Sequence, residues 1–114
     1  MLTIYHNPRC SKSRQTLALI EESNTPVTIV EYLKTPLSED KIKQLLALLK
    51  VSPIEMMRTK ESEFKEQNLA DASDNALIQA MVNTPKLIER PIVEAQGKAV
   101  IGRPPENVMS LIEG

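Results

Sequence analysis

The first thirty residues carry the pattern that most constrains the fold. Residues 2–5, LTIY, form a short apolar segment, and residues 27–30, VTIV, are β-branched enough for a second strand. Residues 11–23 between them have a helical pattern, which Asn24-Thr25-Pro26 ends. A strand, a crossover helix and another strand predict a right-handed parallel βαβ unit. The chain is therefore expected to belong to the α/β class.

The middle of the chain is predicted to be helical. Ser38 precedes a helix whose apolar residues follow the i, i+3, i+4, i+7 pattern of one buried face. Ser52-Pro53-Ile54-Glu55 has the form of a capping box and predicts a short helix that reaches about Arg58. Residues 59–72 are expected to form short helical pieces. Ser73 is expected to cap a further helix that stops before Pro85.

The end of the chain returns to strands. Residues 91–95 and 98–101 flank Gln96-Gly97 and predict a β-hairpin, after which residues 102–105 lead into a last helix. The complete order is βαβ, a helical block, then ββα. We predict one domain, residues 1–114, with a helical insertion at about 36–84. The expected architecture is thioredoxin-like, with a mixed four-stranded sheet and flanking helices.

Composition excludes several classes of function. The 114 residues carry a formal net charge of −1, so no global field would recruit nucleic acid or an anionic membrane. No apolar run is long enough to span a bilayer, and the N-terminus does not read as a signal peptide. One cysteine excludes an internal disulfide, and with one histidine it argues against a metal site. We expect a cytoplasmic protein, because that compartment keeps a thiol reduced.

Cys10 is the candidate nucleophile. It follows the first strand and opens the first helix, where unpaired N–H groups and the helix dipole favour an anion. That position lowers the pKa of a thiol, and the N–H groups there can also hold an oxyanion. A lone cysteine is more often a buried apolar residue. The neighbours of Cys10 in the segment Pro8-Arg9-Cys10-Ser11-Lys12 are instead polar and basic, which favours a functional thiol.

Other residues of the same loop are predicted to assist. Ser13 lies one helical turn beyond Cys10 and could donate its hydroxyl to the sulfur. His6 could stabilise the thiolate through charge or a hydrogen bond, or could simply pack against the loop. Arg9 could add positive potential or remain a surface residue. Ser11, Lys12 and Ser13 are the predicted oxyanion-binding residues at the start of the helix.

Two sets of residues form a recognisable pattern. The first is the segment His6-Asn7-Pro8-x-Cys10-x-x-Ser13-Arg14. The second is three arginines: Arg58, Arg90 before Pro91-Ile92-Val93, and Arg103 before Pro104. The segment resembles the active-site signature of the glutaredoxin-linked arsenate reductases of the ArsC family, and the arginines resemble that family's three arginine positions in the same order. The resemblance covers essentially the whole chain.

The resemblance implies a site and a reaction. Cys10 would be the nucleophile, and Arg58, Arg90 and Arg103 would bind arsenate and polarise it. The arginine fork suits this task because it forms bidentate hydrogen bonds to such oxygens and stays protonated. The resemblance also implies a cis peptide bond at Arg90-Pro91. Glutathione would be the co-substrate, glutaredoxin the partner, and no cofactor would be bound.

Two other classes of function remain open. Spx-type transcriptional regulators share the expected fold and act by binding RNA polymerase, and their redox switch commonly uses a Cys-x-x-Cys pair. Here Ser13 stands at the second position, which favours the enzyme. The other possibility is a thiol oxidoreductase of the same fold that acts on another substrate.

Overall fold

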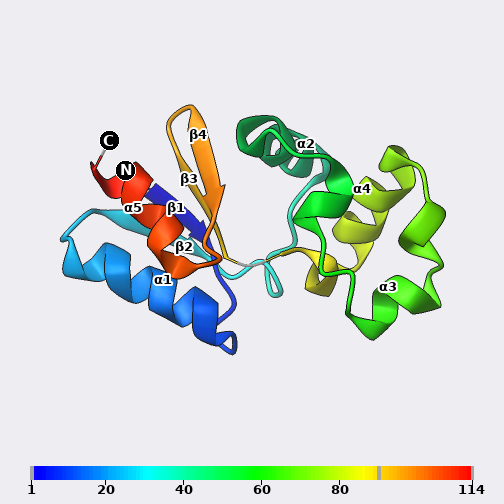
Figure 1. Ribbon diagram of the computed structural model, residues 1–114, viewed down its shortest axis with the longest axis horizontal. Helices are drawn as coiled ribbons and strands as arrows, with labels where there is room; N and C mark the ends of the chain where they lie inside the picture. The colour runs from blue at the N-terminus through cyan, green and yellow to red at the C-terminus, as the bar shows by residue number, and fades with distance from the viewer. Residues whose placement is uncertain (1, 90, 114) are drawn as a thin grey trace. The chain divides into compact units, whose positions relative to one another are not determined.

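The computed structural model describes residues 2–89 and 91–113, and it divides the chain into two compact units (Figure 1). One unit combines Met1–Thr35 with Arg90–Gly114, and the other is Pro36–Glu89. We refer to them as the sheet unit and the helical unit. The prediction of a single domain with an insertion at about 36–84 stays a prediction. The helical unit extends a few residues beyond that insertion, to Glu89.

The sheet unit has the predicted order of strands and helices along the chain. Its strands form one mixed sheet in the order β2-β1-β3-β4, in which β1 pairs parallel with β2 and antiparallel with β3, and β3 pairs antiparallel with β4. The parallel pair and the hairpin thus share one sheet, as predicted. The elements are β1 Leu2–Tyr5, α1 Ser11–Glu22, β2 Val27–Val30, β3 Ile92–Ala95, β4 Lys98–Ile101, the 3₁₀ helix η4 Pro105–Val108, and α5 Met109–Glu113.

One face of the sheet packs against α1 and the C-terminal helices. Leu2 and Ile4 of β1 and Val93 of β3 lie in a buried cluster with Ile20 of α1 and Val108 of η4. The alternation of side chains along β1 brings Leu2 and Ile4 to the same face. Figure 1 shows α1 and α5 lying next to one another along the strands, in agreement with their contacts. This packing fixes the N-terminus of α1 relative to the end of β4.

The helical unit contains the short helices expected in the middle of the chain. Ser73 caps α4 as predicted, since its hydroxyl accepts from the Ala76 N–H. Ser38 precedes α2 as predicted and also caps it, since its hydroxyl accepts from the Lys41 N–H. In the described residues of both units, no helix is long and apolar enough to cross a membrane. The elements of this unit are α2 Glu39–Leu49, η1 Pro53–Met56, α3 Ser62–Glu66, η2 Leu69–Asp71, α4 Asp74–Asn83 and η3 Pro85–Leu87.

The predicted capping box at Ser52 is wrong in its hydrogen bonding. Residues 53–56 form a single 3₁₀ turn, and the Ser52 side chain makes no capping hydrogen bond to it. The hydroxyl instead donates to Glu55 Oε1 at 2.9 Å, while the Glu55 N–H donates to the Ser52 carbonyl at 3.0 Å. A 3₁₀ turn closes hydrogen bonds three residues apart rather than four. The helix therefore ends at Met56, short of Arg58.

Candidate active site

A tight turn places Cys10 at the start of α1. The Cys10 N–H donates to the Asn7 carbonyl at 3.0 Å, and Asn7 Oδ1 accepts from the Arg9 N–H at 3.0 Å. Pro8 takes the second position of this turn, where its fixed φ is favourable. Cys10 is the N-cap residue of α1, and its backbone is extended (φ −96°, ψ 123°). The prediction that Cys10 opens the helix is therefore confirmed.

Cys10 is partly exposed, whereas the side chains behind it are buried. Within the described helix α1, the Cys10 side chain makes no capping hydrogen bond to the backbone. The first turn of a helix has N–H groups without intrahelical partners, and here Ser11, Lys12 and Ser13 supply them. Ser11 and Lys12 are exposed. This end of α1 can therefore offer backbone donors to an anion beside the sulfur.

Ser13 connects His6 to the turn. Its hydroxyl oxygen lies 2.6 Å from His6 Nδ1 and accepts from the Asn7 N–H at 3.0 Å. Ser13 is fully buried, and His6 and Asn7 are about 6% exposed. If His6 Nδ1 carries the imidazole proton, the Ser13 hydroxyl accepts twice and keeps its own proton for a third group. Otherwise the hydroxyl donates to His6. Donation from Ser13 to Cys10 stays a prediction, and it requires the first arrangement.

Burial lowers the pKa of His6. Desolvation is the main cause, the positive charge of Arg14 adds to it, and Glu31 and Glu21 oppose it. A histidine whose pKa lies below its ordinary value of about 6.5 is mostly neutral at pH 7. Stabilisation of the Cys10 thiolate by the charge of His6 therefore fits the structure less well than a role through hydrogen bonding or packing, and an effect of His6 on Cys10 stays a prediction.

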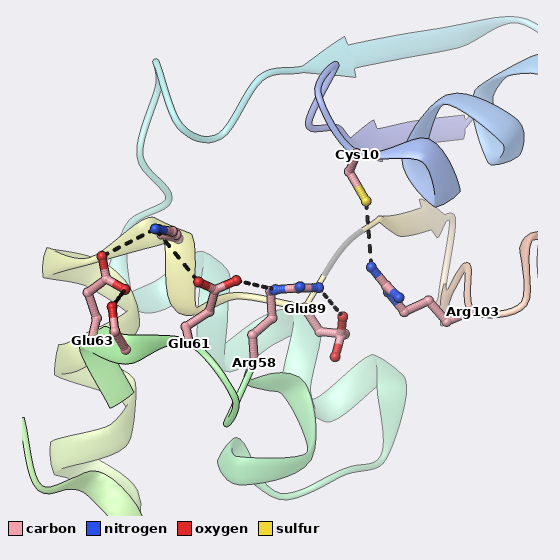
Figure 2. Close-up of polar contacts among 8 residues, drawn as sticks. Cys10, Arg58, Glu61, Glu63, Glu89 and Arg103 are labelled. Atoms are coloured by element: carbon pink, nitrogen blue, oxygen red, sulfur yellow. Dashed lines mark hydrogen bonds and ion pairs between the residues drawn. The ribbon is translucent and has the colours of Figure 1, made fainter. Parts of the chain in front are cut away.

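Arg103 reaches Cys10 from the far end of the sequence. Arg103 Nη2 donates to Cys10 Sγ at 3.5 Å, a contact between residues 93 positions apart (Figure 2). Arg103 is exposed and follows β4, and its peptide bond to Pro104 is cis. A guanidinium beside a thiol favours the thiolate and can bind an oxyanion at the same time. The structure thus brings together two of the predicted site residues.

Gly102 holds the segment that carries Arg103 close to α1. Its N–H donates to the Pro91 carbonyl at 2.8 Å, and its own carbonyl accepts from Thr16 Oγ1 at 3.4 Å. A Cβ at position 102 would lie 2.7 Å from Thr16 Oγ1 and 2.8 Å from Pro91 Cγ. Only glycine fits this approach without movement. The residue before Arg103 is therefore packed directly against the helix that Cys10 opens.

Arg58 lies in the helical unit, between two carboxylates. Met57 and Ile88 form an antiparallel bridge, in which the Arg58 N–H donates to the Leu87 carbonyl and the Glu89 N–H donates to the Met56 carbonyl, both at 2.7 Å. Arg58 Nε donates to Glu61 Oε1 at 3.0 Å, and Nη1 donates to Glu89 Oε1 at 3.2 Å (Figure 2). All three side chains are about one-fifth to one-quarter exposed. A substrate oxyanion at Arg58 would have to share the guanidinium with these carboxylates.

The charges around Arg58 extend further. Lys86 Nζ lies 3.6 Å from Glu61 Oε2 and 3.4 Å from Glu63 Oε2. Three carboxylates therefore lie against two cations. This cluster carries no excess of positive charge that would attract an oxyanion. The predicted role of Arg58 in binding substrate stays a prediction.

Arg90 lies outside the described residues, and so does the predicted cis bond at Arg90-Pro91. Its predicted role in binding arsenate stays a prediction. In the part of the chain that the structure describes, no group of three or more histidine, cysteine, aspartate or glutamate side chains could hold a metal ion.

Comparison with known proteins decides the family. A model described as the ArsC family matches residues 5–111 of this chain. The chain belongs to the ArsC family. The match covers nearly the whole chain, so the resemblance to the ArsC family drawn from the sequence is confirmed. The roles of Cys10, Arg58, Arg90 and Arg103 stay predictions.

Individual ArsC relatives match over nearly their whole length. The uncharacterized protein YfgD of Escherichia coli K12 is 55% identical over 112 residues, covering 96% of this chain and 94% of its own. An arsenate reductase of Neisseria meningitidis is 41% identical over 114 residues, covering 97% of each chain. The solved structure of an arsenate reductase from Vibrio cholerae is 48% identical with a TM-score of 0.92, covering 96% of this chain and 95% of that one. The thioredoxin-like fold is therefore confirmed.

Three residues that hold the site in place had no role assigned from the sequence, although Asn7 stands in the signature segment. Asn7 closes the turn before Cys10, Thr16 joins α1 to Gly102, and Asn107 bonds to the segment around Arg103. Asn7 could have been recognised, because asparagine before proline often initiates a turn. Thr16 and Asn107 act on residues that only the folded chain brings near the site, and no local pattern marks them.

Proposed function

We propose that this ArsC-family protein is an arsenate reductase with Cys10 as its nucleophile. The contact of Arg103 Nη2 with Cys10 Sγ at the N-terminus of α1 is the observation that carries the proposal. It puts a nucleophilic sulfur, a fixed cation and the N–H groups of a helix terminus at one place. Arsenate needs all three, because a multiply charged oxyanion must be held against a thiolate that repels it.

The first step forms a bond between sulfur and arsenic. The Cys10 thiolate attacks the arsenic of arsenate, and one arsenate oxygen leaves as water after taking up protons. Arg103 and the N–H groups at the start of α1 bind the remaining oxygens and offset their charge. We propose that Arg90 and Arg58 complete this set, for which Arg58 would have to be shared with Glu61 and Glu89.

The second step reduces the arsenic. A glutathione thiolate attacks Cys10 Sγ, the electron pair of the sulfur–arsenic bond goes to arsenic, and arsenite leaves. Cys10 and glutathione are then joined in a mixed disulfide, so two thiols have supplied the two electrons. Cys10 is the one cysteine of the 114-residue chain, so the second thiol must come from another molecule. We propose that glutaredoxin then frees Cys10 by thiol–disulfide exchange.

No bound cofactor is required in this scheme, since thiols supply both electrons. The same need for a reduced thiol leads us to propose the cytoplasm as the place where the protein acts. A different oxyanion could meet the same sulfur and the same guanidinium. The assay for the proposal therefore has to compare substrates.

The experiment is an arsenate-dependent NADPH oxidation assay with glutathione, glutathione reductase and glutaredoxin. We expect NADPH oxidation and arsenite production with the wild-type protein and neither with Cys10→Ser. Omitting glutaredoxin should leave a Cys10–glutathione adduct, which intact mass measurement detects. Phosphate, sulfate and selenate serve as comparison anions. Reduction of another of these anions with none of arsenate would refute the proposed substrate, and sustained arsenite production without any external thiol would refute the mechanism.

A further inference from the structure

We propose that Asn107 is a positioning residue that holds Arg103 against Cys10. This inference deepens the proposed function and rests on it, since Arg103 matters to catalysis only if Cys10 is the nucleophile. It assigns a role to Asn107 of η4, whose side chain bonds to the backbone of the segment that carries Arg103.

The Asn107 side chain holds the turn that carries Arg103 at two points. Nδ2 donates to the Ile101 carbonyl at 3.1 Å and to the Arg103 carbonyl at 3.1 Å. The amide nitrogen has two hydrogens, so each carbonyl can receive one. The Asn107 backbone N–H donates to the Pro104 carbonyl at 3.0 Å. Asn107 thus bridges the end of β4 and the residue that follows Gly102.

Arg103 lies in an exposed segment of the chain, where a hydrogen bond to its carbonyl can restrain the direction of the peptide. Arg103, Pro104 and Asn107 are all exposed, and proline has no N–H to donate. Before Arg103 in the chain, Gly102 is fixed by its bond to Pro91 and its packing against Thr16. The amide of Asn107 restrains the carbonyl of Arg103 itself, and the direction of that peptide determines where the guanidinium can reach.

Few side chains could replace this amide. Aspartate has the same shape but no donor when ionised, serine has a single donor, and alanine has none. Exposed hydrogen bonds of this kind contribute little to overall stability. Loss of the amide should therefore affect the thiol and its chemistry more than it affects the fold. Loss of a residue that merely supports the fold should instead lower the Tm more than it changes the reactivity of Cys10.

The experiment measures Cys10 directly and does not require arsenate. Second-order rate constants for alkylation by iodoacetamide are measured across pH for the wild type, Asn107→Ala, Arg103→Gln and the double variant. Asn83→Ala is the matched control, because Asn83 is an exposed asparagine at the end of α4 in the helical unit. Thermal unfolding and the kinetics of arsenate reduction are recorded for the same five proteins.

We expect Asn107→Ala to raise the pH midpoint of Cys10 alkylation, as Arg103→Gln should. The Tm of Asn107→Ala should change by less than about 4 °C. The double variant should resemble Arg103→Gln alone, because a residue that acts through Arg103 has no effect once the guanidinium is gone. In the arsenate assay, kcat/KM of Asn107→Ala should fall about tenfold. Asn83→Ala should match the wild type in each measurement.

Three results would overturn the inference. They are an unchanged alkylation midpoint in Asn107→Ala, additive effects in the double variant, and a fall in Tm large enough to account for the loss of activity. The proposed function is judged separately. If the alkylation pattern appears and arsenate is not reduced, Asn107 positions Arg103 but the proposed substrate is wrong. If arsenate is reduced and the alkylation midpoint does not move, the inference about Asn107 fails and the function stands.

Discussion

Replacing Gly102 with alanine should disturb the site, whereas the same change at Gly97 should not. The new Cβ would lie 2.7 Å from Thr16 Oγ1 and 2.8 Å from Pro91 Cγ, and ordinary contacts begin near 3.4 Å. The neighbours must therefore separate by roughly 0.7 Å before carbon contacts become favourable. Overpacking of this kind costs about 1–3 kcal/mol of unfolding free energy. For a chain of this length about 1 kcal/mol lowers Tm by ~4 °C, so we expect a fall in Tm of about 4–12 °C.

The same movement should reach the active site. Arg103 follows Gly102 directly, and its guanidinium already lies at 3.5 Å from Cys10 Sγ. A displacement of roughly 0.7 Å would break that hydrogen bond, and misplacement by about 1 Å can cost 10²-fold in rate. We therefore expect slower alkylation of Cys10 near neutral pH and at least a tenfold loss in kcat/KM for arsenate.

Gly97→Ala is the matched control for this prediction. Gly97 has φ +76°, and nothing lies within 4 Å of a Cβ built there. Alanine at this position should cost about 1–2 kcal/mol of backbone strain and leave Cys10 unaffected. Adding Thr16→Ala to Gly102→Ala should restore part of the lost stability, since it removes one of the two close contacts. A Gly102→Ala protein with the Tm and the alkylation rate of the wild type would refute the packing argument.

Three further predictions concern single residues. Alkylation of Cys10 should have a pH midpoint below the free-thiol value of ~8.5, and a midpoint at or above that value would contradict activation by the helix terminus. Arg90→Lys should strongly impair arsenate reduction because it loses the bidentate fork, whereas Arg9→Ala should have little effect; similar losses in the two variants would count against the assigned role. The lowered pKa of His6 means that the unfolded chain binds a proton more readily than the folded chain. Stability should therefore fall as the pH drops from about 6.5 towards the pKa of folded His6, and urea unfolding of His6→Asn should lack this part of the pH dependence.

The sequence predicted the sheet unit well because its signals are local. Residues 2–5 and 27–30 are dense in apolar and β-branched side chains, and Gly97 marks the hairpin turn. The helical unit was harder to predict. Its 3₁₀ turns differ from short α-helices only by the closing hydrogen bond, so the pattern at Ser52 predicted the right start and the wrong geometry.

The site shows the same division between local and long-range information. The position of Cys10 at the start of α1 follows from the turn at Asn7-Pro8 and from the helical pattern after it. The partners of Ser13 and the Glu89 partner of Arg58 do not follow from sequence spacing, whereas Glu61 lies only three positions after Arg58. The Ser13 hydroxyl bonds to residues before the turn, and Glu89 lies 31 positions from Arg58. The sequence shows that an arginine such as Arg58 is able to bind an anion. Only the folded chain shows that a distant carboxylate such as Glu89 competes for its guanidinium.

The separation of Cys10 and Arg103 along the chain has a consequence for folding. The contact closes a loop of 93 positions, and β3 must enter the sheet between β1 and β4 before it can form. Closing a loop of this length is costly in entropy, so contacts within β1, α1 and β2 should form earlier. A chain emerging from the ribosome therefore exposes Cys10 before the guanidinium exists, with one edge of β1 still unpaired. We expect such incomplete chains to carry a thiol less reactive than that of the folded protein, because the contribution of Arg103 is added to that of the helix terminus only when the last strands are in place.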